Sequence, residues 1–498
     1  MNALAELCRQ TLAREGAAIR FEGQWIGSAQ VRRIAASLEA ALDAAGIAPG
    51  APIAFAPRNS PASLAGFLPL LARGHVVRMV YPFQSQEALA AALVSLESAA
   101  VIAERADCTP LLRARLQKAG QGLIVLDAEG AELIERGVPP SAASAPVPRI
   151  EILTSGTTGP PRHFPIGHDV VLGYARAAEA QAQTGTPPPP TLLCFPLSNI
   201  SGLYALAASF LRGAPCVLID RFSVEAWRDY LVEYRPVSGG APPAAVAMIL
   251  AADIPAQDLA SLLWFSTGAA PLDPDVRQAF EARYGIPVVQ SYGATEFGGP
   301  VAANSPALLT QFGPGKANSV GRPLPGARIQ VRDPETGELA PPGMVGIIEV
   351  VSPRMGPDWI VTSDLGLIDA DGFVFLHGRD DGAIMRGGFK ILPETVEQAL
   401  LRHPAIAAAS VVGIADQRLH EVPAAAVELT SDCDPPTPRA LEVHLRRNLP
   451  ATHIPVAWRF VAELPKTVSF KIDRGAVRAL FAEEEPDMPP PQSSSPCR

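Results

Sequence analysis

The sequence is poor in cysteine and has no long apolar run. Six cysteines are scattered over 498 residues, with no Cys-x-x-Cys pair and no histidine at metal-ligand spacing. This pattern argues against a disulfide framework or a zinc site and predicts reduced, structural thiols. No uncharged apolar run reaches the roughly 18–20 residues that a helix needs to cross a bilayer, so we expect no membrane span.

The chain also lacks a surplus of positive charge. It holds 41 Lys and Arg against 50 Asp and Glu, a net charge of −9, and its cations are not interleaved with aromatic residues. We therefore expect no nucleic-acid partner, whereas isolated cations suit a small anionic ligand. Residues 1–16 carry four charges and lack the apolar centre of a secretory signal, so a cytoplasmic protein is expected.

Helix and strand signals alternate through the first 150 residues. Ser28 is expected to cap a helix that ends at Gly46, and Ser60-Pro61 to open another that ends near Gly74. Such alternation predicts mainly parallel sheets covered by helices, an α/β fold. The apolar face of the first helix is expected to comprise Val31, Ile34, Ala35, Leu38 and Leu42. The remaining expected elements are a helix at 84–96 and strands at 52–56, 76–80, 100–103 and 123–126.

The pattern of expected secondary structure changes near Gly321. Short strands at 327–332 and 346–351, joined through a turn at 335–338, predict a small antiparallel β region. The sequence thus indicates a large N-terminal domain, residues 1–381, and a small mobile C-terminal α+β domain, residues 382–482. Residues 483–498 are acidic and then Pro- and Ser-rich, which predicts a disordered tail.

The stretch Ile152-Leu153-Thr154-Ser155-Gly156-Thr157-Thr158-Gly159-Pro160-Pro161-Arg162 is the most informative segment. Its glycines let successive backbone N–H groups point into one concavity, its hydroxyls add donors, and Arg162 adds charge, so the loop can hold a phosphate. It lacks the Gly-x-x-x-x-Gly-Lys-Ser/Thr pattern of a P-loop. The alternative is an ordinary loop after a strand.

Four further segments follow in order: Ser291-Tyr292-Gly293-Ala294-Thr295-Glu296; Thr362-Ser363-Asp364-Leu365-Gly366; Gly378-Arg379-Asp380-Asp381 running to Arg386-Gly387-Gly388; and Leu464-Pro465-Lys466-Thr467 running to Lys471-Ile472-Asp473-Arg474. With the opening loop, they resemble in order and spacing the adenylate-forming superfamily of acyl- and aryl-CoA ligases, firefly-type luciferases and peptide-synthetase adenylation domains. The resemblance covers nearly the whole chain. It implies ATP and Mg²⁺ as cofactors, CoA as co-substrate, and a small carboxylic acid that is converted to an acyl-adenylate.

The resemblance also implies roles for the first two segments. The loop residues Thr154, Ser155, Gly156, Thr157, Thr158 and Gly159, with Arg162, would hold the β- and γ-phosphates. Within the segment that includes Ser291 and Ala294, Thr295 would donate to the α-phosphate and Glu296 would ligate Mg²⁺. Tyr292 would offer its ring beside adenine, and Gly293 would let the backbone come close. The alternative for Glu296 is a surface carboxylate.

Three residues resemble the family's ribose and catalytic groups. Asp364 would accept hydrogen bonds from the ribose hydroxyls, with Arg379 as its partner, and Lys471 would contact the α-phosphate and carboxylate oxygens in the transition state. The alternatives are a turn aspartate, a surface ion pair and a solvated lysine. Asp381 matches the family's hinge. Arg386, Gly387 and Gly388 match the region that meets the thiol of CoA.

Several positions depart from the family pattern. Arg162 stands for a lysine and keeps the charge, and His163 and Ser363 stand for glycines. Gly382 replaces an acidic residue, and Phe470 adds bulk directly before Lys471. Asn199 stands where many relatives carry histidine. These departures point to an unusual substrate or to an altered second step, in which the acyl group passes from the adenylate to its acceptor.

The segments that form the acyl pocket of relatives are rich in small residues. They include Asn199, Gly202, Gly239, Gly240, Gly268 and Ala269. Small walls leave room for a bulky apolar group, unless the glycines only serve tight turns. Residues 195–204 contain no acid that could bind an α-amino group, so a hydrophobic fatty, alicyclic or aryl acid is expected rather than an amino acid.

The leading interpretation is an acid–thiol ligase of the AMP-forming acyl-CoA synthetase type. A second is an adenylating enzyme that passes its acyl group to a carrier-protein thiol or an amine. A third is a nucleotide-binding pseudoenzyme, which the departures favour and the retained Lys471, Glu296, Asp364 and Arg379 oppose. The identity of the acid and whether the chain forms a homodimer stay open.

Overall fold

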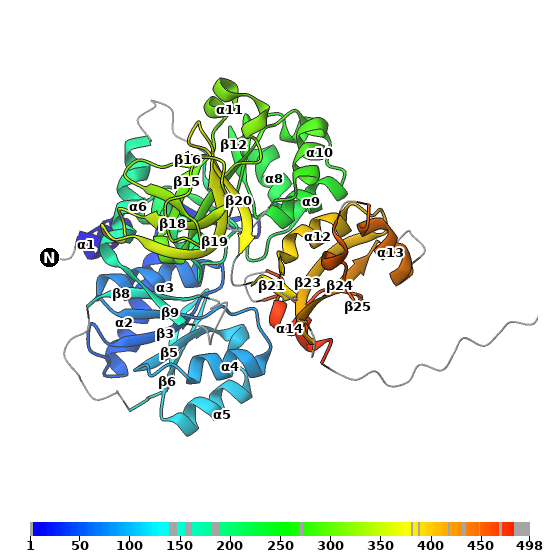
Figure 1. Ribbon diagram of the computed structural model, residues 1–498. Coiled ribbons are helices and arrows are strands. Elements are labelled where there is room, and N and C mark those ends of the chain that lie inside the picture. Colours follow the sequence, from blue (N-terminus) through cyan, green and yellow to red (C-terminus); the bar gives the residue numbers. More distant parts are fainter. Residues whose placement is uncertain are drawn as a thin grey trace, which may run out of the picture. The chain divides into compact units, whose positions relative to one another are not determined.

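The computed structural model describes residues 3–138, 147–154, 162–181, 189–268, 272–379, 382–386, 389–416, 419–430, 435–447, 449–467 and 471–482. The chain divides into two compact units, described separately here (Figure 1). Unit 1 takes residues 1–362 and 366–376. Unit 2 takes residues 363–365 and everything from 377 onward.

A seven-stranded sheet forms one half of unit 1, in the order β7-β6-β5-β3-β4-β8-β9. The five inner strands are parallel and the two edge strands antiparallel, as alternating helices and strands predict. The strands are β3 (Pro52–Ala56), β4 (Val76–Met79), β5 (Ala100–Glu104), β6 (Gly122–Asp127), β7 (Gly130–Glu135), β8 (Arg149–Thr154) and β9 (Arg162–Gly167). The helices of this part are α1 (Ala3–Ala13), α2 (Ser28–Ala44), α3 (Pro61–Ala72), α4 (Gln86–Val94) and α5 (Pro110–Ala119).

The first helices test the sequence interpretation directly. The expected face of α2 is buried, and Ser60 caps α3 by accepting a hydrogen bond from the Ser63 N–H at 3.1 Å. The cap assigned to Ser28 is wrong. Gly27 occupies the N-cap position in an extended conformation, and Ser28 is already the first helical residue.

Two more sheets belong to unit 1. One has the order β12-β13-β14-β15-β16, with β12, β13 and β14 parallel, and the other the order β10-β11-β1-β2. Their strands are β12 (Ser238–Gly240), β13 (Trp264–Gly268), β14 (Val288–Ala294), β15 (Gly299–Ala303), β16 (Arg322–Pro323), β10 (Thr191–Leu193), β11 (Cys216–Leu218), β1 (Ala17–Phe21) and β2 (Gln24–Gly27). The helices are α6 (His168–Gln181), α7 (Ile200–Ala208), α8 (Val224–Tyr234), α9 (Pro243–Ala251), α10 (Pro274–Tyr284) and α11 (Pro306–Phe312).

The predicted antiparallel region is present. Strands β17 (Arg328–Arg332) and β18 (Gly346–Val351) pair antiparallel, and the Asp333 N–H donates to the Glu338 carbonyl at 2.9 Å across the expected turn. The sheet continues through β19 (Ile360–Ile368) and β20 (Val374–Arg379).

Unit 2 is a small α+β unit, as predicted. Its sheet has the order β22-β21-β24-β23, and β25 pairs parallel with β24. The strands are β21 (Ile384–Arg386), β22 (Phe389–Ile391), β23 (Ile406–Asp416), β24 (His420–Leu429) and β25 (Ala457–Val461), and the helices α12 (Pro393–Leu401), α13 (Pro438–Leu445) and α14 (Arg474–Ala479). Asp381, at the expected domain boundary, and the tail 483–498 lie outside the described residues, so those two predictions stay predictions.

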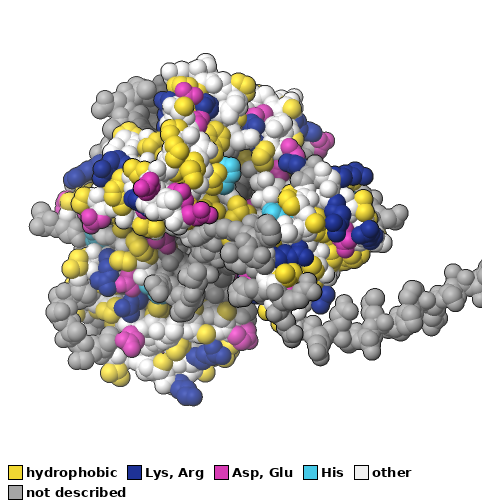
Figure 2. Space-filling view, in the orientation of Figure 1, with side chains coloured by type: hydrophobic (Ala, Val, Ile, Leu, Met, Phe, Trp, Pro, Cys, Tyr) yellow, Lys and Arg dark blue, Asp and Glu magenta, His cyan; other side chains and the backbone are white. Residues whose placement is uncertain are grey.

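Two surface properties bear on partners. Among the residues that the structure describes, no helix combines the length and apolarity required to traverse a membrane. On the face drawn in Figure 2, Lys and Arg side chains occur together with Asp and Glu side chains. The absence of a nucleic-acid partner stays a prediction.

Candidate active site

The predicted phosphate loop is the connection of a β-hairpin. Strand β8 ends at Thr154 and β9 begins at Arg162, and these two residues face each other across the antiparallel pair. The hairpin places the loop at the carboxyl end of β8, a different arrangement from the strand–loop–helix of a P-loop. The intervening predicted residues, Ser155, Gly156, Thr157, Thr158 and Gly159, lie outside the described part of the chain.

A second part of the site lies where β12, β13 and β14 end. Gly240 pairs with Ser266, and Gly268 with Ser291, so the carboxyl ends of these parallel strands share one sheet edge. This is the edge at which open α/β sheets bind ligands. The chain then turns through a 3₁₀ helix, Thr295–Phe297, in which Thr295 and Glu296 are half-buried.

The backbone after Glu296 is held by three side chains that the sequence did not single out. Ser352 donates to the Phe297 carbonyl at 2.6 Å, and Arg354 to the Pro300 carbonyl at 2.8 Å. The Tyr174 hydroxyl donates to the Gly298 carbonyl. Because Tyr174 lies on α6, which follows β9 directly, this contact joins the phosphate hairpin to the Glu296 segment.

Tyr292 and Gly293 serve the protein's own packing. The Tyr292 side chain is 6% exposed, and its ring meets Phe297 edge-on with centroids 5.6 Å apart. A Cβ on Gly293 would lie 2.6 Å from the Pro300 Cα. The close approach that we predicted for a nucleotide at Gly293 is therefore made by β15, while adenine contact at Tyr292 stays a prediction.

The acyl-pocket assignment of the small residues stays a prediction, and their surroundings bear on the room that they were expected to leave. A Cβ would lie 2.0 Å from the Pro196 carbonyl oxygen at Gly202, and 2.5 Å from the Ser291 hydroxyl at Gly268. At Gly239 it would meet the Leu262 side chain at 3.2 Å, and at Gly240 the Ser266 carbonyl oxygen at 3.2 Å. These glycines admit neighbouring protein atoms, so they do not by themselves indicate room for a bulky acyl group. Ala269 lies outside the described residues.

Asn199 has a local structural role. It is the N-cap of α7, where its Oδ1 accepts the Gly202 N–H at 2.9 Å. Asparagine is among the best N-cap residues and histidine is not. Asn199 thus has a structural role as a helix cap, and its place in the acyl pocket stays a prediction.

The two predicted ribose residues come together in unit 2. Asp364 on β19 and Arg379 at the end of β20 have Oδ1 and Nη1 3.7 Å apart. Arg379 also donates to the Ser363 hydroxyl. Ser363, which stands for a glycine of the family pattern, is therefore a hydrogen-bonding partner of the predicted ribose arginine.

Lys471 lies at the base of a short antiparallel turn in unit 2. The Thr467 N–H donates to the Lys471 carbonyl at 2.6 Å, and the Asp473 N–H to the Pro465 carbonyl at 2.8 Å. Lys471 is exposed. Phe470 lies outside the described residues, so its effect on this turn stays open.

The predicted CoA-binding region begins at the end of β21. Arg386 lies opposite Phe389 across the β21–β22 pair, and its guanidinium donates to the Thr452 carbonyl at 2.5 Å. Gly387 and Gly388, between these strands, lie outside the described residues.

Comparison with known proteins decides the family. A family model described as "AMP-binding enzyme" matches residues 8–357, and a second, "AMP-binding enzyme C-terminal domain", matches residues 395–471. The chain belongs to the AMP-binding, adenylate-forming enzyme family. The predicted resemblance is thereby confirmed.

Relatives within the family are ligases. The chain is 32% identical to "Sulfoacetate--CoA ligase" of Cupriavidus necator over 359 residues, 68% of this chain and 67% of the relative. It is 33% identical to "Probable 2-succinylbenzoate--CoA ligase" of Mycobacterium tuberculosis over 67% of this chain and 84% of the relative. It is 29% identical to "Long-chain-fatty-acid--CoA ligase" of Bacillus subtilis, where 66% of this chain aligns with 61% of the relative.

Solved structures of the family share the fold. The o-succinylbenzoate CoA synthetase MenE of Bacillus subtilis, solved with its acyl-adenylate, gives a TM-score of 0.77 at 24% identity over 96% of this chain and 98% of that one. The amide bond synthetase McbA of Marinactinospora thermotolerans gives 0.76 at 25% identity over 96% and 99%. The predicted arrangement of a large N-terminal and a small C-terminal part is therefore confirmed.

Glu296 is the residue that the resemblance assigns to magnesium. Among the described residues, no three His, Cys, Asp or Glu side chains cluster as a metal site. Mg²⁺ is commonly held by one or two carboxylates together with substrate phosphates. A single half-buried carboxylate, Glu296, fits that mode.

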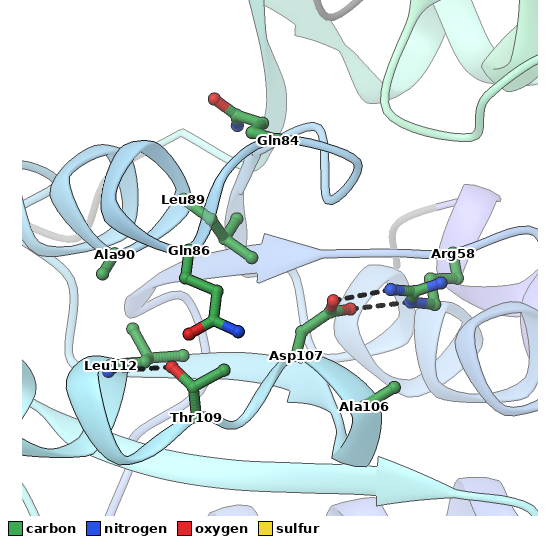
Figure 3. Close-up of a pocket in the computed structure, with 9 residues that line it drawn as sticks. All are labelled: Arg58, Gln84, Gln86, Leu89, Ala90, Ala106, Asp107, Thr109 and Leu112. Atoms are coloured by element: carbon green, nitrogen blue, oxygen red, sulfur yellow. Dashed lines mark hydrogen bonds and ion pairs between the residues drawn. The ribbon is translucent and has the colours of Figure 1, made fainter.

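Unit 1 also has a pocket of about 210 Å³ that the sequence did not indicate (Figure 3). It opens beside the carboxyl ends of β3 and β5, from which the chain leaves toward opposite edges of the sheet. Its charged lining is already paired, because the Arg58 guanidinium donates to both Asp107 carboxylate oxygens, at 2.7 and 2.8 Å. None of the predicted site residues lines it. The lining residues are Arg58, Gln84, Gln86, Leu89, Ala90, Ala106, Asp107, Thr109 and Leu112.

Proposed function

We propose that the chain activates a carboxylic acid with ATP and transfers the acyl group to the thiol of CoA. A carboxylate oxygen attacks the α-phosphorus, the bond to the bridging oxygen breaks, and pyrophosphate leaves. The CoA sulfur then attacks the acyl carbon and AMP leaves. The observation that carries this proposal is the meeting of Asp364 and Arg379 from separate motifs, in a chain matched by both family models.

The chain's residues supply charge and donors along this route. The hairpin loop closed by Thr154 and Arg162 would hold the leaving phosphates through N–H groups, hydroxyls and the arginine. Glu296 would hold Mg²⁺, which neutralises phosphate charge when bound. Lys471 would stabilise the negative charge that develops on the α-phosphate and carboxylate oxygens.

The acid is proposed to be hydrophobic. The support is the absence of an acidic side chain between Phe195 and Tyr204. The pocket glycines no longer add support, because protein atoms occupy the space beside them. A panel of fatty, alicyclic, aryl and sulfonated acids, assayed by pyrophosphate release, tests the class. Turnover restricted to sulfonated or amino acids would reject it.

The catalytic assignment predicts the behaviour of a matched pair of variants. Lys471→Ala should lower adenylate formation by roughly 10²-fold or more, because it removes a charge aimed at the transition state. Lys466→Ala, five residues earlier in the same turn, should stay near wild type, because Lys466 is paired with exposed Glu463 at 2.6 Å. Near-normal pyrophosphate release by Lys471→Ala would refute the assignment.

A second acceptor is favoured by one comparison. The chain is 25% identical to the amide bond synthetase McbA over nearly its whole length. The adenylate would then pass to an amine instead of a thiol. Incubation of enzyme, ATP and a productive acid with CoA, a carrier protein or an amine, followed by mass spectrometry, distinguishes the acceptors. If none of the acids in the panel led to pyrophosphate release, both acceptors would be rejected in favour of a nucleotide-binding pseudoenzyme.

A further inference from the structure

A cluster of three charged side chains lies in unit 2 and contains no residue to which a role was assigned above. It consists of Arg474 at the start of α14 and of Glu394 and Glu397 on α12. Arg474 Nη2 is 2.8 Å from Glu394 Oε1 and 3.2 Å from both Glu397 oxygens. One guanidinium nitrogen therefore bridges two carboxylates that lie one helical turn apart.

The cluster is tied to the backbone around it. Glu397 Oε1 accepts the Val411 N–H of β23 at 2.8 Å. A Cβ on Gly378 would lie 2.7 Å from Glu394 Oε2, and one on Gly382 would lie 2.9 Å from Arg474 Nη1. Gly378 therefore lies beside Glu394, and Gly382 lies beside Arg474. A Cβ on Gly382 would only require the end of the flexible Arg474 side chain to shift.

Arg474 stands three residues after Lys471. Between them, Asp473 donates its N–H to the Pro465 carbonyl, and its carboxylate caps α14 by accepting the Ala476 N–H at 3.0 Å. The turn that carries Lys471 thus leads directly into α14. The first residue of that helix, Arg474, is bound to the two carboxylates of α12.

Resting on the proposed function, we propose that Arg474, held by Glu394 and Glu397, is a positioning residue that fixes the lysine turn on unit 2. It touches no substrate. It acts by setting where the Lys471 amine can reach, and misplacement of a catalytic group by about 1 Å can cost roughly 10²-fold in rate.

The charge balance among Arg474, Glu394 and Glu397 predicts the effect of substituting them. Arg474 faces Glu397 and Glu394, and removal of the arginine leaves the largely buried Glu397 carboxylate without its countercharge. Arg474→Gln should therefore loosen the turn, and Glu397→Gln added to it should restore part of the loss, because one uncompensated buried carboxylate disappears. A residue that only fills space would show no such rescue.

Hydrogen exchange of the full chain, read by mass spectrometry at pH 8, tests the proposal without any substrate. In Arg474→Gln, the Thr467 and Asp473 amides should exchange at least about tenfold faster, while the amides of β24 keep their protection. The matched control is Arg478→Gln on the same helix. Arg478 donates to the Gly413 carbonyl at 2.9 Å and does not bond α12.

The second readout is turnover with whichever acid is productive. Arg474→Gln should lower kcat for pyrophosphate release roughly 10- to 100-fold with little change in the KM for ATP, and the double variant should recover part of that loss. Unchanged exchange in Arg474→Gln, equal loosening in Arg478→Gln, or no rescue would overturn the proposal. If no acid turns over, the proposed function fails, whereas the exchange result still decides whether Arg474 holds the turn.

Discussion

At the scale of single residues, three departures from the family pattern have identifiable contacts in the structure. Asn199 caps a helix, Ser363 accepts a hydrogen bond from Arg379, and Gly382 lies beside the Arg474 guanidinium. None of these partners is near in sequence to the residue it contacts, except the cap at Gly202. The sequence alone could identify the departures but not their contacts.

Gly378 gives a residue-scale prediction. Its φ of +106° is one that L side chains rarely adopt, and an added Cβ would meet Glu394 Oε2 at 2.7 Å. Gly378→Ala should destabilise unit 2 by about 1–3 kcal/mol, measured by hydrogen exchange of β24 in increasing urea. Gly337→Ala, at φ +72° with open space, isolates the backbone strain alone, and its effect is read from exchange of β17 and β18 in unit 1. An effect of Gly378→Ala no larger than that of Gly337→Ala would show that the carboxylate simply moves aside.

At the scale of elements, local signals predicted well what depends on local physics. Helices α2 and α3 and strands β3 to β6 follow from apolar periodicity, a serine cap and Pro at the first helical position. The contacts that the sequence analysis missed join residues that are far apart in the chain. Tyr174 reaches Gly298 across 124 residues, and Arg474 reaches Glu394 across 80. No pattern in one sequence encodes such pairs.

The pairing of α12 with α14 predicts a pH dependence. Burial, only partly opposed by Arg474 and the Val411 N–H, raises the pKa of Glu397 from 4.5 to about 7. A carboxyl group whose pKa is higher in the folded state stabilises the fold fully below about pH 4.5, and this contribution is lost as the pH rises through 7. Unit 2 should thus lose up to about 3 kcal/mol between pH 5 and 8.

Glu397→Gln should flatten that dependence, because the amide oxygen still accepts the Val411 N–H but does not ionise. Urea unfolding at several pH values, read by exchange in β23, measures it. Glu463→Gln is the control, since Glu463 is exposed and paired only with Lys466. A slope equal to that of wild type in Glu397→Gln would contradict the argument.

At the scale of the whole molecule, the cysteines that the structure describes are mostly buried. Four of them, Cys8, Cys108, Cys194 and Cys216, are free thiols, three buried and Cys108 partly buried. Burial raises the pKa of Cys108 to about 11 and those of Cys8 and Cys194 to about 12, and that of Cys216 rises as well. The predicted reduced, structural role fits this environment.

These four thiols should therefore react slowly with iodoacetamide at pH 8 in the native chain, since the reactive species is the thiolate. Unfolding in urea should accelerate labelling by roughly two orders of magnitude, because a free thiol has a pKa near 8.5. Peptide mass spectrometry resolves each site. Rapid native labelling of Cys216 would show that the core around it opens readily.

Unit 2 is assembled from two separate stretches of the chain, with residues 363–365 inserted through a strand whose flanks group with unit 1. No single cut can therefore release it whole. A fragment that ends at residue 376 carries Asp364 but leaves Arg379 behind, so the pair would reform only if both pieces were mixed and reassociated. A split-protein reporter or a domain swap that cuts the chain between β19 and Arg379 would therefore part Asp364 from Arg379.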